Sequence, residues 1–119
     1  MILDRFRLDG RVALVTGDSR GLGQGIALGL AEAGADIAGL HTEAAETTAA
    51  AVKALGRRYL PMRYDLSTAT GDDLRQVVER VVDGLGRLDI LVNNAGIIRR
   101  APAMEFSEAD WDDVLQVNL

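Results

Sequence analysis

Three glycines in one short loop are the residues whose spacing points most clearly to chemistry. The loop is Thr16-Gly17-Asp18-Ser19-Arg20-Gly21-Leu22-Gly23, and it follows the apolar run Val12–Val15. A strand, a glycine turn and a helix in this order place backbone N–H groups and a helix N-terminus against a phosphate. Gly17 permits a tight turn, and Gly21 and Gly23 leave room for a pyrophosphate or a neighbouring strand. The loop predicts a dinucleotide site, although a three-glycine pattern alone has low specificity.

Apolar runs alternate with helical patterns along the chain, and these elements must position the loop. The predicted strands are Val12–Thr16, Asp36–Leu40, Arg58–Tyr64 and Asp89–Asn93; the predicted helices are Leu22–Ala33, Glu43–Leu55, Gly71–Leu85 and one capped by Ser107. Such alternation predicts an α/β fold with a parallel sheet and right-handed crossovers. The consecutive apolar residues Ile90–Val92 predict a strand that is covered on both faces.

Two local patterns add detail to this plan. Gly21, Gly25 and Gly29 lie four residues apart, so we expect a smooth stripe where the first helix packs closely against the sheet. The last helical pattern stops at Leu119 without a glycine, a proline or a basic last turn. We therefore expect a single domain over residues 1–119 that is cut short within the helix beginning near residue 107.

Composition excludes several classes of function. The chain has 119 residues, a net charge of −5, one histidine and no cysteine. The acidic balance excludes a basic nucleic-acid footprint, and the lack of cysteine excludes disulfides and thiolate metal sites. No signal-peptide core and no membrane-spanning apolar run is visible. We expect a cytoplasmic protein with no metal, no nucleic-acid partner and no membrane partner.

Three further motifs follow the glycine loop in a fixed order. Asp65-Leu66 follows the third predicted strand, Asn93-Asn94-Ala95-Gly96 follows the fourth, and Asn118 lies in the last helix. Together with the loop, they resemble the short-chain dehydrogenase/reductase family across essentially the whole chain. The resemblance implies the N-terminal part of a Rossmann-type, doubly wound parallel sheet, with four strands in the order 3-2-1-4.

The resemblance also implies which residues bind a nicotinamide dinucleotide. They are Gly17, Ser19, Arg20, Gly21, Leu22 and Gly23 in the loop, His41 after the second strand, Asp65 and Leu66 after the third, and Asn93, Ala95 and Gly96 after the fourth. Asp65 would bind the adenine amino group, although a turn residue at a strand end is the structural alternative. Asn93 is equally consistent with a cofactor contact and with a structural tie between strands.

Only one of the four residues that the family uses for catalysis is present. Asn118 matches the asparagine that anchors a water in a proton relay. The serine and the Tyr-x-x-x-Lys motif are absent, because Arg63 follows Tyr59 at that spacing and Thr68 follows Tyr64. A phenol without such help is a poor base at neutral pH. We expect these 119 residues to bind a cofactor without turnover, as half of an enzyme that forms a tetramer.

The choice between NAD and NADP depends on the end of the second strand. NAD-preferring members carry an acid there, but this chain has His41 followed by Thr42. Arg20 either meets a 2′-phosphate or is a solvated loop residue. We favour NAD, because three stretches resemble family members that oxidise sugar acids and mostly use NAD. These stretches are Gly21–Leu30, Ala95–Arg100 and Phe106–Val114.

Those stretches also suggest a substrate of the 2-deoxy-D-gluconate or 2-keto-3-deoxygluconate type. Arg99 and Arg100 follow the fourth strand, and they could pair with a sugar-acid carboxylate or with an acidic residue. Two alternatives remain open. The glycine loop also resembles that of 3-oxoacyl-thioester reductases, and a short chain could be a binding module without catalysis.

Overall fold

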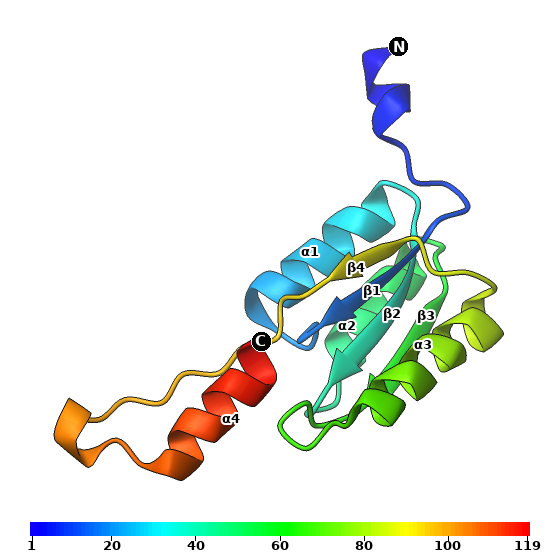
Figure 1. Cartoon of the computed structure of the whole chain (residues 1–119). Helices are drawn as coiled ribbons and strands as arrows, with labels where there is room; N and C mark the ends of the chain where they lie inside the picture. The colour runs from blue at the N-terminus through cyan, green and yellow to red at the C-terminus, as the bar shows by residue number, and fades with distance from the viewer.

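The computed structural model describes residues 1–119 and contains a four-stranded parallel sheet with helices on both faces (Figure 1). The strand order is β3-β2-β1-β4, as expected. The strands are β1 (Val12–Thr16), β2 (Asp36–His41), β3 (Tyr59–Arg63) and β4 (Ile90–Val92). β1 pairs with β2 over its whole length and with β4 over three residues, so all strands end at the same edge.

Four α-helices connect or follow these strands. They are α1 (Gly21–Glu32), α2 (Glu46–Ala54), α3 (Gly71–Leu85) and α4 (Glu108–Asn118). α3 has the predicted bounds because Thr70 and Asp73 form a capping box before it and Gly86, at φ 92°, ends it. α2 begins three residues later than predicted. Two 3-10 helices, Ile2–Phe6 and Ala103–Glu105, were not predicted.

Each face of the sheet has its own apolar core. On one face, α1 and α2 cover a cluster that includes Val15, Ile37 and Val52. On the other face, α3 covers a cluster that includes Leu14, Met62 and Val81. The two clusters follow from the alternation of side chains along β1 and β2. Helices therefore cover both faces of the sheet at β1 and β2, as in a doubly wound fold.

Two packing expectations are wrong. A Cβ added at Gly25 or at Gly29 would meet nothing within 4 Å, so these glycines do not bring α1 close to the sheet. Nor is β4 covered on both faces, because Leu91 is 55% exposed. β4 pairs with β1 alone and forms an open parallel edge, as the strand order predicts.

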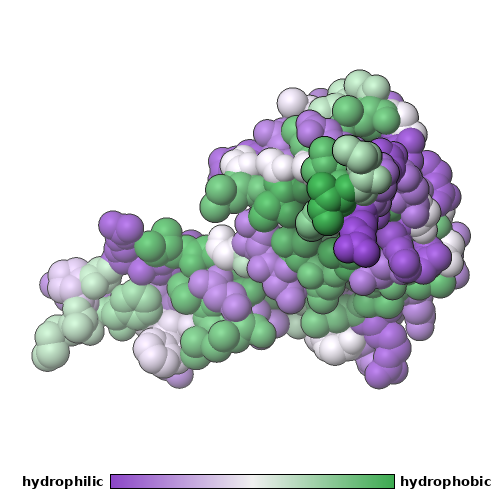
Figure 2. Space-filling view, turned by 90° about the horizontal axis from the view of Figure 1, so that it is seen from above, coloured by the Kyte–Doolittle hydropathy of each residue, from purple (hydrophilic) through white to green (hydrophobic).

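The last segment extends away from the sheet (Figure 1). The molecule measures 56 × 28 × 26 Å, because this segment and the N-terminal 3-10 helix project from the body. Ser107 caps α4 as predicted, since its Oγ accepts a hydrogen bond from the Asp110 N–H at 3.1 Å. Apolar side chains remain at the surface of the projecting segment (Figure 2). None of the helices combines the length and the apolar character that crossing a membrane requires.

Candidate functional site

A cavity of about 430 Å³ lies where the strands end and α1 begins. Its size is typical of small-molecule sites. Ten of the twelve predicted cofactor-binding residues line it: Gly17, Ser19, Arg20, Gly21, Leu22, His41, Asp65, Leu66, Ala95 and Gly96. These ten residues come from four separate parts of the chain, which the parallel strands bring to one edge of the sheet, and Val117 of the last helix also lines the cavity.

The other two predicted residues lie elsewhere. Gly23 sits behind the loop, where a Cβ would come within 2.0 Å of the Gly17 carbonyl oxygen and 2.5 Å of the Asn94 Nδ2. Its role is to let α1 approach the glycine turn. Asn93 lines a second, mostly apolar cavity of about 240 Å³ on the α3 face. Its neighbour Asn94 lines the main cavity instead.

The start of α1 presents unpaired N–H groups to the cavity. Arg20 is the N-cap residue, and no side chain caps the helix. The backbone N–H groups of Gly21, Leu22 and Gly23 donate no hydrogen bond within the chain, because the first backbone donor of α1 is Gln24. Free donors and the positive end of the helix dipole form a site that suits an anion such as a pyrophosphate.

Thr16 and Asn94 join the glycine turn to the end of β4. The Thr16 Oγ1 accepts hydrogen bonds from the N–H groups of Asn94 at 3.1 Å and Ala95 at 2.9 Å. The Asn94 Nδ2 donates to the carbonyl oxygens of Thr16 and Gly17, both at 3.1 Å. These reciprocal bonds fix two walls of the cavity relative to each other.

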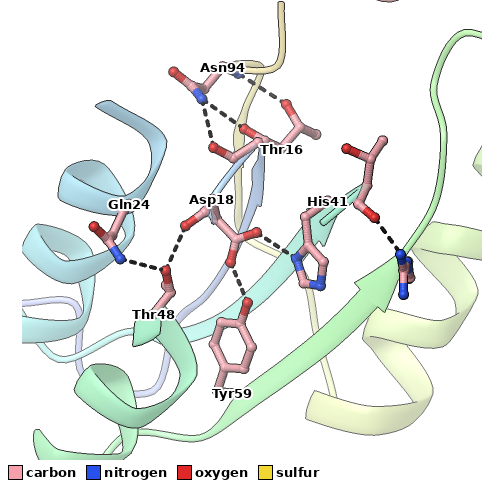
Figure 3. A network of polar contacts seen from close by, with 10 residues as sticks. Thr16, Asp18, Gln24, His41, Thr48, Tyr59 and Asn94 are labelled. Atoms are coloured by element: carbon pink, nitrogen blue, oxygen red, sulfur yellow. Dashed lines mark hydrogen bonds and ion pairs between the residues drawn. The ribbon is translucent and has the colours of Figure 1, made fainter. Parts of the chain in front are cut away.

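A buried carboxylate anchors the glycine loop from below (Figure 3). Asp18 has no exposed surface, and its carboxylate accepts hydrogen bonds from the Tyr59 hydroxyl and from the His41 Nδ1 at 2.8 Å. The Asp18 carbonyl oxygen accepts from the Thr48 hydroxyl at 2.8 Å. The Gln24 Nε2 in turn donates to Thr48 at 3.1 Å. Burial, together with the hydrogen bond to Asp18, raises the pKa of Tyr59.

Asp65 keeps its carboxylate at the opposite side of the cavity. Hydrogen bonds from the Ser67 side chain and backbone N–H hold the pKa of Asp65 below its ordinary value. The group is therefore an ionised acceptor at neutral pH. The adjacent Leu66 supplies an apolar surface to the same wall. A carboxylate beside an apolar surface suits a ring that carries an amino group.

Both polar atoms of the Asn118 side chain hold the loop after β4. Its Oδ1 accepts from the Ile97 N–H at 2.9 Å, and its Nδ2 donates to the Ile97 carbonyl oxygen at 3.1 Å. This two-point contact joins the end of α4 to the cavity wall. The Gln116 Nε2 adds bonds to the carbonyl oxygens of Leu66 and Ala69.

The side chains present do not complete an acid–base site. Tyr59 is buried beneath the loop and bonded to Asp18. The Tyr64 hydroxyl interacts with Asp73, which raises the pKa of Tyr64 and removes it further from neutral pH. No group of three or more His, Asp or Glu side chains is placed to hold a metal ion. What the site can do alone is bind and orient a ligand.

Sequence reasoning missed several supporting residues, namely Thr16, Asp18, Gly39, Thr48, Tyr59 and Asn94. A signal for part of this set was available. Gly39 and His41 lie two apart on β2 and therefore face the same side of the sheet. The contact of Asp18 with this face depends on how the loop folds back, which no local pattern reveals.

The comparisons with known proteins agree with this geometry. The family model described as short chain dehydrogenase matches residues 11–119. The 2-dehydro-3-deoxy-D-gluconate 5-dehydrogenase of Dickeya dadantii (strain 3937) is 52% identical over 119 residues, which cover 100% of this chain and 46% of that protein. The chain thus spans less than half the length of such curated relatives.

Two solved structures share the fold. A short chain dehydrogenase from Burkholderia cenocepacia J2315 in complex with NADP has a TM-score of 0.89 and 42% identity, over 95% of this chain and 46% of that one. A short chain dehydrogenase from Mycobacterium paratuberculosis bound to NAD has a TM-score of 0.85 and 33% identity, over 94% and 46%. On the fold, the site and the family model together, the chain belongs to the short-chain dehydrogenase family.

Proposed function

We propose that this chain is the cofactor-binding half of a NAD(P)-dependent oxidoreductase acting on a sugar acid of the 2-deoxy-D-gluconate or 2-keto-3-deoxygluconate type. One observation carries the cofactor class: the uncapped start of α1 faces a cavity lined by residues from the ends of several strands. The similarity to the Dickeya dadantii enzyme supports the substrate class.

The residues present fit a nicotinamide dinucleotide. The N–H groups of Gly21 and Leu22, which line the cavity, would hold the pyrophosphate, and the tight Gly17–Gly23 contact lets it approach the backbone. Asp65 and Leu66 would hold the adenine, His41 and Arg20 the adenosine ribose, and Ala95 and Gly96 the nicotinamide side. A bound nicotinamide would supply the hydride acceptor for oxidation of a substrate carbinol to a ketone, with the hydroxyl proton passing to a base.

We propose that residues 1–119 form a half-domain, cut within α4, and that serine, tyrosine and lysine side chains complete the site. Asn118 remains the proposed contribution of this chain to the proton relay. Because both polar atoms of its side chain bind Ile97, the side chain acts by positioning the loop after β4.

Arg100 is the proposed partner of the sugar-acid carboxylate. Its side chain is exposed and forms no ion pair, whereas the Arg99 Nε lies 3.6 Å from the Asp110 Oδ1. A free guanidinium can bind a carboxylate through two parallel hydrogen bonds. Arg100→Ala should raise KM for the sugar acid and leave dinucleotide affinity unchanged, and an unchanged KM would contradict this assignment.

We also propose a cytoplasmic homo-oligomer, a tetramer in its complete form. Trp111 is 58% exposed and Leu115 is 40% exposed on α4, so this helix has an apolar surface without a partner in the chain. Light scattering of the purified protein tests the assembly. A monomer at micromolar concentration would contradict it.

The test of the proposed function is an assay of the complete polypeptide with NAD or NADP. We expect reduced nicotinamide to appear with 2-keto-3-deoxygluconate. In a separate reaction supplied with NADH or NADPH, we expect an acetoacetyl thioester to leave the reduced nicotinamide unconsumed. Thioester reduction without sugar-acid oxidation would favour the reductase alternative. Failure to bind either dinucleotide, measured by calorimetry, would refute the cofactor assignment itself.

A further inference from the structure

The end of β2 lacks the acidic residue that usually binds an adenosine ribose, but an acid lies directly beneath it. His41 occupies that position and lines the cavity, and its Nδ1 bonds to the buried Asp18. Because an ionised carboxylate only accepts hydrogen bonds, the Nδ1 must carry the proton in this contact. The carboxylate therefore fixes both the orientation of the imidazole and the position of this proton.

The second ring nitrogen of His41 is available to a ligand. The Nε2 forms no hydrogen bond in the chain (Figure 3). No fully buried side-chain nitrogen or oxygen lacks a partner, so the Nε2 is reached from the solvent side. His41 itself is only 6% exposed, which leaves the ring little freedom to turn away. One hydrogen-bonding atom is thus presented to the cavity in a fixed position.

The Asp18–His41 pair also carries no net positive charge. With Asp18 as a carboxylate, the pair carries a net charge of −1 when the imidazole is neutral and zero when it is protonated. Neither state offers a net positive charge to a phosphate dianion. Either state can hydrogen-bond a hydroxyl, since a ribose hydroxyl is both donor and acceptor.

The sheet makes room for this arrangement at Gly39. A Cβ at that position would lie 2.0 Å from the Asp18 Oδ2 and 2.4 Å from the Tyr59 hydroxyl. Any other residue at this point of β2 would displace the carboxylate. The glycine, the two donors to the carboxylate and the Thr48 bond to its backbone all position the same buried charge.

We propose that Asp18, acting through His41, makes this site prefer a dinucleotide whose adenosine ribose carries no 2′-phosphate. This inference rests on the proposed function. Asp18 is a positioning residue, because it cannot touch the ligand. Arg20 lines the same cavity, and its positive charge favours a 2′-phosphate, which opposes the effect of Asp18. Arg63 is engaged elsewhere, because its Nε donates to the Thr42 carbonyl oxygen at 2.9 Å. The preference is therefore finite and measurable.

The test compares ADP-ribose with 2′-phospho-ADP-ribose by calorimetry on the complete polypeptide. We expect wild type to bind ADP-ribose more tightly, and Asp18→Asn to reduce the ratio of the two Kd values by about tenfold, because the His41 imidazole then loses the anionic acceptor that fixes its Nδ1 proton and its orientation toward a ribose hydroxyl. Tyr59→Phe is the matched control. It removes a hydrogen bond to Asp18 and keeps the charge, so both affinities should change by the same factor.

A double-mutant cycle separates transmission through His41 from general damage to the loop. In a His41→Ala background, Asp18→Asn should leave the ratio unchanged. The ¹⁵N resonance of the His41 Nε2, assigned by its loss in His41→Gln, should shift when ADP-ribose saturates wild type. Equal losses for both ligands in Asp18→Asn, or an unmoved Nε2 resonance, would overturn the proposal. If neither ligand binds wild type, the proposed function fails first.

Discussion

The helices α1 and α3 both begin with glycine, but their first turns are built in opposite ways. α3 starts with Thr70, whose Oγ1 accepts from the Asp73 N–H at 3.2 Å while the Asp73 carboxylate accepts from the Thr70 N–H at 2.9 Å. α1 starts with Arg20, which caps nothing. The first turn of α3 contains two acidic residues, and that of α1 contains none.

The difference shows that the start of α1 lacks the local capping bonds that stabilise the start of α3. A helix without caps has unpaired donors, which normally cost stability. α1 is held instead by contacts distant in sequence: the Thr16–Asn94 bonds beside its first turn and the Asp18 anchor before it. Its free N–H groups therefore stay available to a ligand, whereas in α3 the Thr70 side chain already accepts from the Asp73 N–H.

The largest expected effect is at Gly23, the closest approach in the α1 start. In Gly23→Ala the new Cβ would overlap the Gly17 carbonyl oxygen, because the distance would be 2.0 Å. We expect a loss of about 3 kcal/mol in the free energy of unfolding. Dinucleotide binding should be lost as well. Urea denaturation and calorimetry measure the two effects.

Gly25→Ala is the control for that change, since its Cβ meets nothing within 4 Å. It should be neutral or stabilise α1 by up to about 1 kcal/mol, because alanine is the better helix former. Similar losses in the two variants would mean that the start of α1 is not constrained by contact with the loop.

The second prediction concerns the distant contacts that replace a cap. Thr16→Val removes the hydroxyl that accepts from the N–H groups of Asn94 and Ala95. We expect a loss of about 2 kcal/mol, because two partly buried donors would lose their partner. Thr16→Ser keeps the hydroxyl and should retain most of the stability. Equal unfolding midpoints in urea for the two variants would contradict this account.

The contrast between the helices also explains what the sequence could reveal. The bounds of α3 were predictable because Thr70, its apolar spacing and Gly86 all lie within or beside the helix. The strand order and most of the cavity lining were predictable because the motifs recur at the ends of strands. In contrast, Asp18 depends on Tyr59, which lies 41 residues away, and no local pattern reports such a contact.

The errors have similar physical origins. The sequence left Asn93 open between a cofactor contact and a structural tie, and the structure places it in the second cavity while Asn94 bonds to Thr16. The spacing of Gly25 and Gly29 suggested close packing, yet their face of α1 meets no neighbour. Residue types indicate what a position permits, whereas the direction of a side chain at a turn depends on contacts with the rest of the chain.

The third prediction concerns two substitutions, one that removes the cap of α3 and one that adds a cap to α1. Thr70→Ala should lower the free energy of unfolding by about 1 kcal/mol and leave dinucleotide affinity unchanged. Arg20→Asp should add a cap to α1 and raise that free energy by up to about 1 kcal/mol, while its carboxylate competes with the ligand for the N–H groups. Arg20→Ala separates this competition from the loss of the arginine.

The two measurements together decide whether α1 is uncapped for binding. Arg20→Asp should weaken ADP-ribose binding by at least about tenfold, since a carboxylate would replace the phosphate as acceptor. A variant that gained stability and bound ADP-ribose as well as Arg20→Ala would remove the link between the missing cap and the ligand.

The smallest expected effect is the acid sensitivity of the α3 start. The Tyr64 hydroxyl and the bonds from Thr70 hold the pKa of Asp73 below its ordinary value of 3.8. The ionised carboxylate therefore stabilises the fold at pH values above 3.8, and this contribution disappears as the pH falls through the lowered pKa. Asp73→Asn should be less stable than wild type at pH 7, and the difference should shrink in denaturation curves recorded below pH 3.8.

Asp72→Asn is the control, because it removes a first-turn charge of α3 without removing a capping bond. A difference between wild type and Asp73→Asn that stayed constant with pH would mean that the Asp73 charge plays no part in the cap. α1 offers no equivalent titration, since its first turn carries no acidic side chain. Loss of the Asp73 charge in acid should therefore weaken the start of α3, with no corresponding change in the first turn of α1.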